Sequence, residues 1–324
     1  MTDMHFGAFV PQGWKMDLVA VGDDPQAKWA RVKEVAQIAD AAGYDSIWVY
    51  DHFHNVPRPA HEAVFECWTT MAALAEVTSN VRLGQMVGCA AYRNPGLLAK
   101  ITSNIDVISG GRLDWGIGAG WYDNEFRGYG YEFLAAKDRL GVLRETVEIV
   151  KSMWTQPETT YAGKYFTLER ANCDPKPVQT PHPPVWIGGG GEKVTLRIVA
   201  EHADRSNWGG NPEEWAHKAK VLEGHCAAVG RDYDEITKTW HPDCVVRETE
   251  DEVKALYDAG VRSLWNEPYE SWQAGNLIGT PDQVADRIRA YMELGCGGLV
   301  LWFPEFPGTE SLELFASRVI PQFR

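Results

Sequence analysis

The sequence predicts a (β/α)8 barrel, and three observations support this fold class. Short apolar stretches alternate with amphipathic stretches along the whole chain, which gives roughly eight βα units. A length of 324 residues suits a barrel that forms one domain. No GxGxxG motif follows the first apolar stretch, and this argues against the alternative, an open doubly wound sheet.

The first part of the chain predicts two strands and two helices. We expect strands at His5–Val10 and Ser46–Tyr50, because both are short apolar runs. Pro25–Ala42 has apolar residues at the spacing of an amphipathic helix, and Gly43 provides a C-terminal cap. A second helix is expected at Phe65–Val77.

A βαβ unit follows, and the rest of the chain is organised around it. Val81–Val87 and Arg112–Gly118 are predicted strands, and Pro95–Ser109 is the helix between them. A proline at the first helical position costs no hydrogen bond. Both strands end in loops of small residues, and parallel units of this kind bind ligands at the carboxyl ends of their strands.

The remaining chain repeats the alternation after a strong helix at Ala136–Trp154. The proline-rich stretch 155–184, with a hairpin around Tyr161–Phe166, is interpreted as an insertion folded over one end of the core, so that residues 1–324 form a single domain. The later strands are expected at Val185–Ile187, Asp204–Trp208, Ile236–Val245, Val261–Trp265 and Gly298–Phe303. The later helices are expected at Glu192–His202, Pro212–Val229, Asp251–Ala259, Thr280–Leu294 and Ser311–Val319.

Composition narrows the class of function. With 31 basic and 45 acidic residues the net charge is −14, which argues against binding of nucleic acid through phosphates. No apolar run approaches the ~18 residues of a membrane span, and the first 13 residues lack the basic-then-apolar pattern of a signal peptide. The six cysteines are scattered without metal-binding spacing. We therefore expect a cytoplasmic protein with no metal and no membrane partner.

Four consecutive glycines form the most distinctive motif. Gly188, Gly189, Gly190 and Gly191 come directly after a predicted strand and before a predicted helix. Free backbone N–H groups at a helix N-terminus bind anions, so this motif indicates a phosphate site. A tight turn between strand and helix is the alternative interpretation.

The pair Asp51-His52 provides the best acid/base candidate, because it lies where a buried strand is expected to reach the surface. An imidazole titrates near neutral pH and can give or take a proton. The position of His52 in the sequence is equally consistent with an ordinary surface histidine at the start of a loop. Asp51 is expected to point to the opposite face. Asp123 and Glu125 are expected to be solvated, and the other histidines show no zinc pattern.

Fourteen tryptophans are many for this length, and several fall at predicted strand ends or in loops. Trp121 and Trp208, together with Phe53 beside the candidate histidine, are therefore candidates for an aromatic substrate pocket. Packing in the core and at its rim is the alternative.

Five stretches in this order resemble the luciferase-like monooxygenase superfamily, and within it the oxidoreductases that use the deazaflavin coenzyme F420. They read SIWVYDHF, VRLG, YRNPGLLAKITSNIDVISGGRLDWGIGAGWYDNEFRGYG, PKPVQTPHPPVWIGGGGEK and GTPDQVADRI. The resemblance implies a barrel with an insertion, a tricyclic ring lying across the strand ends, and a phosphate near the four glycines. It implies a non-prolyl cis peptide between Met86 and Val87. It makes His52, in the Asp-His-Phe motif, the catalytic residue. The implied cofactor-binding residues are Asp51, Met86, Val87, Gly88, Cys89, Gly120 and the four glycines.

Two departures from the family's sugar-phosphate dehydrogenases affect the expected substrate. Those enzymes have a tryptophan at the position aligned with Val56 and a glutamate at the position aligned with Trp121. A flatter, more apolar substrate therefore fits this chain better. The resemblance predicts hydride transfer between reduced F420 and a small organic molecule, in a protein that forms a homodimer. An FMN-dependent monooxygenase and a non-enzymatic flavin- or deazaflavin-binding protein are the alternatives.

Overall fold

Eight parallel strands of the described residues close into a barrel in the computed structural model, which describes residues 4–262, 264 and 266–324. The barrel strands are β1 (His5–Phe9), β2 (Ser46–Val49), β3 (Arg82–Gln85), β5 (Leu113–Gly118), β8 (Val185–Gly188), β9 (Arg205–Trp208), β10 (Thr237–Trp240) and β13 (Cys296–Leu301). Leu83 pairs with Leu113 and His5 pairs with Gly298, so the ring has no open edge. The predicted (β/α)8 barrel is confirmed.

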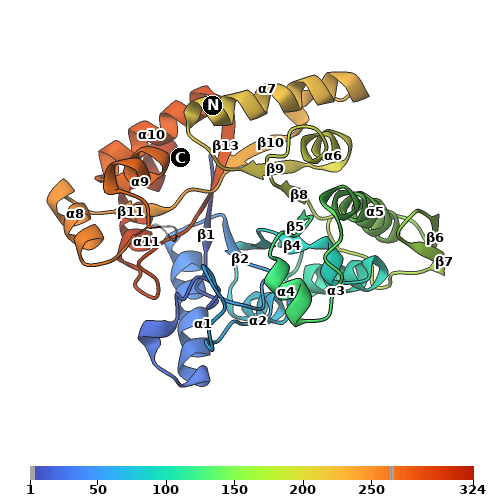
Figure 1. Cartoon of the computed structure of the whole chain (residues 1–324), viewed down its shortest axis with the longest axis horizontal. Helices are drawn as coiled ribbons and strands as arrows, with labels where there is room; N and C mark the ends of the chain where they lie inside the picture. The colour runs from blue at the N-terminus through green and yellow to red at the C-terminus, as the bar shows by residue number, and fades with distance from the viewer. Residues whose placement is uncertain (1–3, 263, 265) are drawn as a thin grey trace.

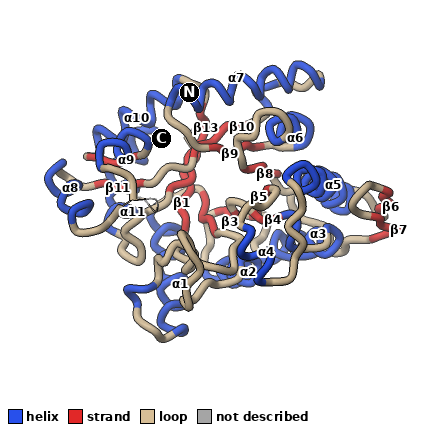
Figure 2. Tube along the Cα trace, viewed as in Figure 1, coloured by secondary structure: helices blue, strands red, loops and turns tan. Residues whose placement is uncertain are grey.

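Helices surround the strands, as Figures 1 and 2 show. They are α1 (Pro25–Ala42), α2 (Cys67–Val77), α3 (Pro95–Ile108), α4 (Asp123–Gly128), α5 (Ala136–Thr155), α6 (Thr195–His202), α7 (Pro212–Val229), α8 (Glu250–Asp258), α9 (Tyr269–Gly275), α10 (Pro281–Glu293) and α11 (Glu310–Leu314). Asn211 and Thr280 each form a capping box, with proline at the next position. No helix of the described residues is long and apolar enough to cross a membrane.

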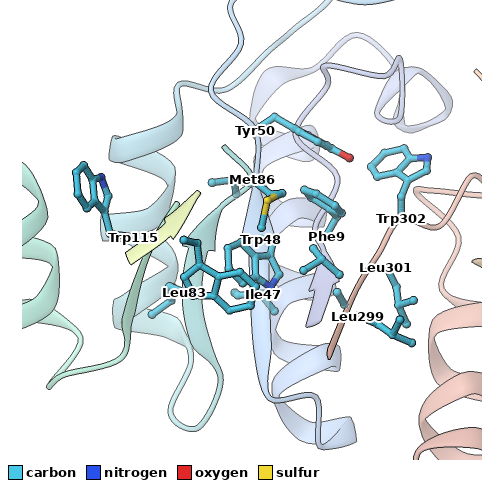
Figure 3. Packing of buried hydrophobic residues seen from close by; sticks show 14 of the residues in the cluster. Phe9, Ile47, Trp48, Tyr50, Leu83, Met86, Trp115, Leu299, Leu301 and Trp302 are labelled. Atoms are coloured by element: carbon cyan, nitrogen blue, oxygen red, sulfur yellow. The ribbon is translucent and has the colours of Figure 1, made fainter. Parts of the chain in front are cut away.

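Trp48 fills the interior of the barrel between two glycines. A Cβ added at Gly7 or Gly84 would lie 2.3 Å from the Trp48 ring, so only glycine fits at these two positions. The ring also packs edge-on against Trp186, with ring centroids 4.5 Å apart. Tyr50 and Trp302 lie above Trp48 in the view of Figure 3, nearer the carboxyl ends of the strands. The core thus supports an aromatic layer at that end.

The insertion does not cover an end of the barrel, which differs from our expectation. Its hairpin, β6 (Thr159–Ala162) and β7 (Thr167–Ala171), lies at the outer edge of the molecule beside α5 (Figure 1). Glu145 of α5 accepts hydrogen bonds from three successive hairpin amides, and Ser103 of α3 donates to the Pro175 carbonyl. The segment therefore covers the outer helix layer.

The last third differs from the prediction in several places, and α9 was not predicted. The strand expected at Ile236–Val245 is interrupted at Pro242, and its end forms β11 (Cys244–Val246), which pairs with β12 (Leu277–Gly279). Val261, Arg262 and Leu264 are not in a strand, and Ser263 and Trp265 lie outside the described residues. The closing helix continues as the π-helical segment η4 (Phe315–Val319). The short 3-10 segments are η1 (Val19–Val21), η2 (Ala90–Tyr92), η3 (Tyr233–Glu235) and η5 (Ile320–Phe323).

Candidate active site

A cavity of about 500 Å³ opens at the carboxyl ends of the barrel strands. This is the end at which parallel barrels carry their active sites. Ten of the predicted site residues line it: Asp51, His52, Met86, Val87, Gly88, Cys89, Gly120, Trp121, Gly188 and Gly189. The structure therefore brings together side chains that come from four separate strand ends.

One side of the cavity, which we call the glycine wall, consists of Val87, Gly88, Gly118, Gly120, Gly188 and Gly189. The peptide between Met86 and Val87 is cis, as predicted, and the chain continues as β4 (Gly88–Cys89) beside the end of β5. A Cβ at Gly118 would lie 2.5 Å from Val87 Cγ2, and one at Gly188 would lie 2.6 Å from Val87 Cγ1. The bulge after β3 thus fits against backbone that carries no side chains.

Asp51 fastens this bulge to the barrel. Its buried carboxylate accepts a hydrogen bond from the Cys89 backbone N–H at 2.9 Å. The Arg93 guanidinium binds both carboxylate oxygens, at 2.6 and 3.0 Å. A bidentate pair of this kind combines charge with a defined geometry. Asp51 therefore supports the glycine wall and does not pair with its neighbour His52.

His52 is held by Glu125, a residue that our sequence reasoning placed in solvent. Glu125 is wholly buried on the short helix α4, and its Oε2 lies 2.8 Å from His52 Nδ1. Tyr92 donates its hydroxyl hydrogen to the same oxygen at 2.9 Å. The backbone N–H groups of Phe53 and His54 donate to Oε1 at 2.6 and 2.9 Å. All four of these interactions converge on one carboxylate.

These contacts determine the protonation state of Glu125. Burial by itself raises the pKa of Glu125, but the hydrogen bond and charge of His52 and the two backbone N–H groups outweigh it, so the pKa lies below its ordinary value. An ionised carboxylate only accepts hydrogen bonds, so His52 donates through Nδ1. Nε2 has no hydrogen-bond partner among the described residues, and it remains available for a proton or a ligand.

A second side of the cavity, which we call the aromatic wall, consists of Trp14, Lys15, Tyr50, His52 and Trp121. The His52 and Trp14 rings stack at a centroid distance of 4.0 Å with an interplanar angle of 5°. Trp121 meets His52 edge-on at 5.9 Å, and 52% of its surface is exposed. The candidate acid/base residue therefore lies between two indole rings.

The loop that carries Trp14 and Lys15 is fixed by its neighbours. The Gln12 amide donates to the Tyr50 carbonyl at 2.8 Å and accepts from the Tyr50 N–H at 2.7 Å. Asn55 donates to the Gly13 carbonyl at 2.7 Å. Gly13 has a φ of +99°, and a Cβ there would lie 1.8 Å from the Ala63 carbonyl oxygen. The loop therefore needs glycine at this position and presents Trp14 in one orientation.

The polar residues of the cavity that were not predicted as site residues include Lys15, His241 and Asp243. The His241 ring is accessible from the cavity but surrounded by protein, and burial, together with Lys15 and Lys218, lowers its pKa to about 4. Burial also raises the pKa of Asp243, which Lys15 partly opposes. His241 and Asp243 follow β10 on either side of Pro242. That strand-end position was the signal that could have identified them.

The family model of luciferase-like monooxygenases matches residues 4–276. The chain belongs to this family. The F420-dependent glucose-6-phosphate dehydrogenase of Amycolatopsis mediterranei is 28% identical over 323 residues, which cover 90% of this chain and 93% of that protein. The FMNH2-dependent dimethylsulfone monooxygenase of Pseudomonas putida is 26% identical over 327 residues, with coverage of 90% and 87%.

A solved structure supports the fold of this luciferase-like chain. The coenzyme F420-dependent tetrahydromethanopterin reductase from Methanopyrus kandleri superposes with a TM-score of 0.80 at 20% sequence identity. The match covers 99% of this chain and 100% of that one. Relatives in the luciferase-like family thus include proteins named for F420 and proteins named for FMN.

Four predicted site residues of this luciferase-like protein lie elsewhere. Trp208 packs against Trp215 of α7, with ring centroids 5.2 Å apart, and is absent from the cavity lining. Phe53 packs against Tyr129 outside the cavity. Gly190 and Gly191 are also absent from the lining, and α6 begins only at Thr195. The glycines therefore do not open the helix directly, although Thr195 of its first turn lines the cavity.

Proposed function

We propose that this protein is an oxidoreductase that binds coenzyme F420 and transfers a hydride between the reduced deazaflavin and a small organic substrate. The observation that carries the proposal is the His52–Glu125 pair beside a wall of glycines in the same cavity. The similarity to the F420-dependent dehydrogenase of Amycolatopsis mediterranei supports the choice of cofactor. The reduced deazaflavin, when bound, supplies the hydride chemistry.

The glycine wall fits a flat ring. The Val87 side chain fills the space that a Cβ at Gly118 or Gly188 would need, so this face consists of Val87 and glycine backbone. A planar group could therefore pack against Val87 and the neighbouring Gly88 without meeting a larger side chain from these glycines. Gly188, Gly189 and the first turn of α6 at Thr195 would hold the phosphate, because the backbone N–H groups of a helix N-terminus favour anions.

His52 would move the proton that accompanies hydride transfer. Its Nδ1–H is engaged by Glu125, which fixes the ring and leaves Nε2 for the substrate. An imidazole oriented in this way can donate a proton to, or accept one from, a substrate oxygen near neutral pH. Glu125 acts as a positioning residue, because its carboxylate contacts His52 and does not line the cavity.

The aromatic wall favours a flat substrate of low polarity. Trp121 stands where the family's sugar-phosphate dehydrogenases have a glutamate, and its ring is half exposed at the edge of the cavity. An indole at this position offers stacking area and no hydrogen-bond acceptor for sugar hydroxyls. The proposed substrate is therefore an aromatic or unsaturated small molecule.

Cofactor titration tests the proposal directly. Purified full-length protein is titrated separately with F420 and with FMN, and cofactor fluorescence is followed. Reduced F420 is then incubated with the protein and a panel of flat acceptors. We expect saturable F420 binding and oxidation of reduced F420 by at least one acceptor. Tight binding of FMN with no binding of F420 would contradict the proposal and favour the FMN-dependent monooxygenase. Binding without any turnover would favour the non-enzymatic alternative.

A further inference from the structure

Lys15 is a cation held in a cage of aromatic rings. Its Nζ lies 4.2 Å from the centroid of the Trp302 ring, 5.4 Å from Tyr50 and 5.7 Å from Trp14. The loop that carries it is fixed by the Gln12–Tyr50 hydrogen bonds described above. Ring faces attract ammonium groups but satisfy none of their N–H donors. The ammonium therefore has three donors to offer to the cavity that it lines.

The carboxylates nearest to Lys15 are engaged elsewhere. Asp17 accepts a hydrogen bond from the Gly13 N–H at 2.5 Å, and Asp243 accepts one from Trp272 Nε1 at 2.8 Å. Among the described residues no carboxylate lies within 4 Å of Lys15 Nζ, and the ammonium makes no hydrogen bond to protein. Lys15 is half-buried and faces the cavity, so its ammonium is only partly hydrated and is not paired with a carboxylate. An anionic group of a ligand in the cavity could therefore pair with it.

We propose that Lys15 binds a carboxylate on the substrate, so that the preferred substrates are small aromatic or unsaturated carboxylic acids. This inference deepens the proposed function and rests on it for the reaction itself. The charged end would lie at Lys15, and the flat body would extend along Trp14, whose ring contacts both Lys15 and His52. The group that reacts would then lie beside His52.

The charge of the surroundings favours a carboxylate over a phosphate. Asp243 lines the same part of the cavity and contributes a negative charge when ionised. A phosphate monoester carries about −1.5 to −2 charges near neutral pH, so one ammonium beside an aspartate neutralises it poorly. A carboxylate carries a single charge, so beside Lys15 and Asp243 it is repelled less than a phosphate. This part of the aromatic wall is therefore a monoanion site.

A pair of neutral and charged probes tests the proposal. Binding of 2-naphthoate and of 2-naphthamide to the full-length protein is measured by calorimetry, with and without F420. We expect the wild-type protein to bind naphthoate about 10-fold or more tightly than the amide, because a hydrogen bond between two charged groups is stronger than one to a neutral amide. In Lys15→Met, which keeps the length of the side chain in the cage, this ratio should fall to about one.

The matched control is Lys33→Met, because Lys33 lies 5.8 Å from the Trp29 ring and does not line the cavity. It should keep the wild-type ratio. Equal affinity of the wild-type protein for the two probes, or an unchanged ratio in Lys15→Met, would overturn the inference. Circular dichroism of Lys15→Met, with Lys15→Gln as a second variant, separates loss of the site from loss of the fold. If the wild-type protein fails to bind F420 but discriminates the probes through Lys15, the proposed function fails and the carboxylate site stands.

Discussion

The two walls of the cavity reach their shapes by different means. The glycine wall is shaped by backbone, because the bulge after β3 packs where glycines leave no Cβ. The aromatic wall is shaped by side chains, and it carries the ionisable groups Lys15 and His52. The first wall can select a flat molecule by shape but cannot move a proton. The second can orient a substrate and move a proton. Changes in the two walls should therefore have separable effects on cofactor binding and on turnover.

The largest effect is expected from His52→Ala, which removes the proton-transfer group and leaves the glycine wall intact. A positioned general acid or base typically contributes 10²–10⁴-fold. We expect kcat with reduced F420 and a turned-over acceptor to fall by about that factor, while the Kd for F420 changes little. Stopped-flow absorbance of F420 oxidation measures the first quantity, and fluorescence titration measures the second. An unchanged rate would show that His52 is not the acid/base residue.

A smaller loss is expected from Glu125→Gln, which changes the partner of His52 without removing the histidine. The amide nitrogen would donate where Oε2 now accepts from Nδ1, so the imidazole would have to carry its proton on Nε2. We expect kcat to fall by about 10- to 100-fold, since a mispositioned general base loses part of the contribution of about 10²–10⁴.

Recovery by a shorter carboxylate distinguishes positioning from a merely structural role. An aspartate keeps the negative charge and can accept a hydrogen bond from the imidazole, whereas glutamine keeps the size of the side chain but not its charge. Glu125→Asp should therefore recover part of the rate that Glu125→Gln loses. A rate in Glu125→Asp no higher than that in Glu125→Gln would contradict the assigned role.

Gly118→Ala tests the glycine wall most directly. The new Cβ would lie 2.5 Å from Val87 Cγ2, so the bulge must shift. Overpacking of this kind costs about 1–3 kcal/mol, and we expect the Kd for F420 to rise by about 5- to 150-fold with little effect on the pH profile. The double variant Gly118→Ala with Val87→Ala should restore much of the affinity. Gly224→Ala is the control, because a Cβ there meets no atom within 4 Å. If Gly118→Ala bound F420 as tightly as the wild-type protein does, the bulge would not be part of the cofactor site.

The barrel could be predicted from the sequence because local patterns determine its elements. The bounds expected for α1 and α7 match the structure, since proline and glycine mark both ends of α1 and Asn211 caps α7. The Met86–Val87 cis peptide was predicted from the family resemblance, and periodicity or spacing could not have indicated it. The missed pair β11 and β12 consists of three-residue strands, which are too short to show a period.

The candidate site could be predicted only in part, because long-range packing decides which polar groups are buried. Glu125 looks like a solvated residue on a short helix, and its partner His52 lies 73 positions earlier in the chain. Trp208 was misplaced because consecutive strand residues point to opposite faces. Asn207 lines the cavity, so Trp208 points outward to α7. Only the register of β9 in the closed barrel determines which of the two faces inward.

The last effect concerns stability and not turnover: Asp17→Asn tests whether the loop of the aromatic wall responds to pH. Burial raises the pKa of Asp17 from 3.8 to about 6, against the opposing hydrogen bond from Gly13 and the charge of Lys15. The folded protein binds more protons than the unfolded chain between these values, so the contribution of Asp17 to the free energy of unfolding falls as pH rises from 3.8 to about 6. The whole fall amounts to at most about 3 kcal/mol.

Urea unfolding at several pH values in this window measures the effect. The free energy of unfolding should depend less on pH in Asp17→Asn than in the wild type or in Asp23→Asn, a change at an exposed position. If the free energy of unfolding changed with pH in the same way in all three proteins, Asp17 would not make the stability of the loop depend on pH. The two walls would then differ in their chemistry but not in their response to pH.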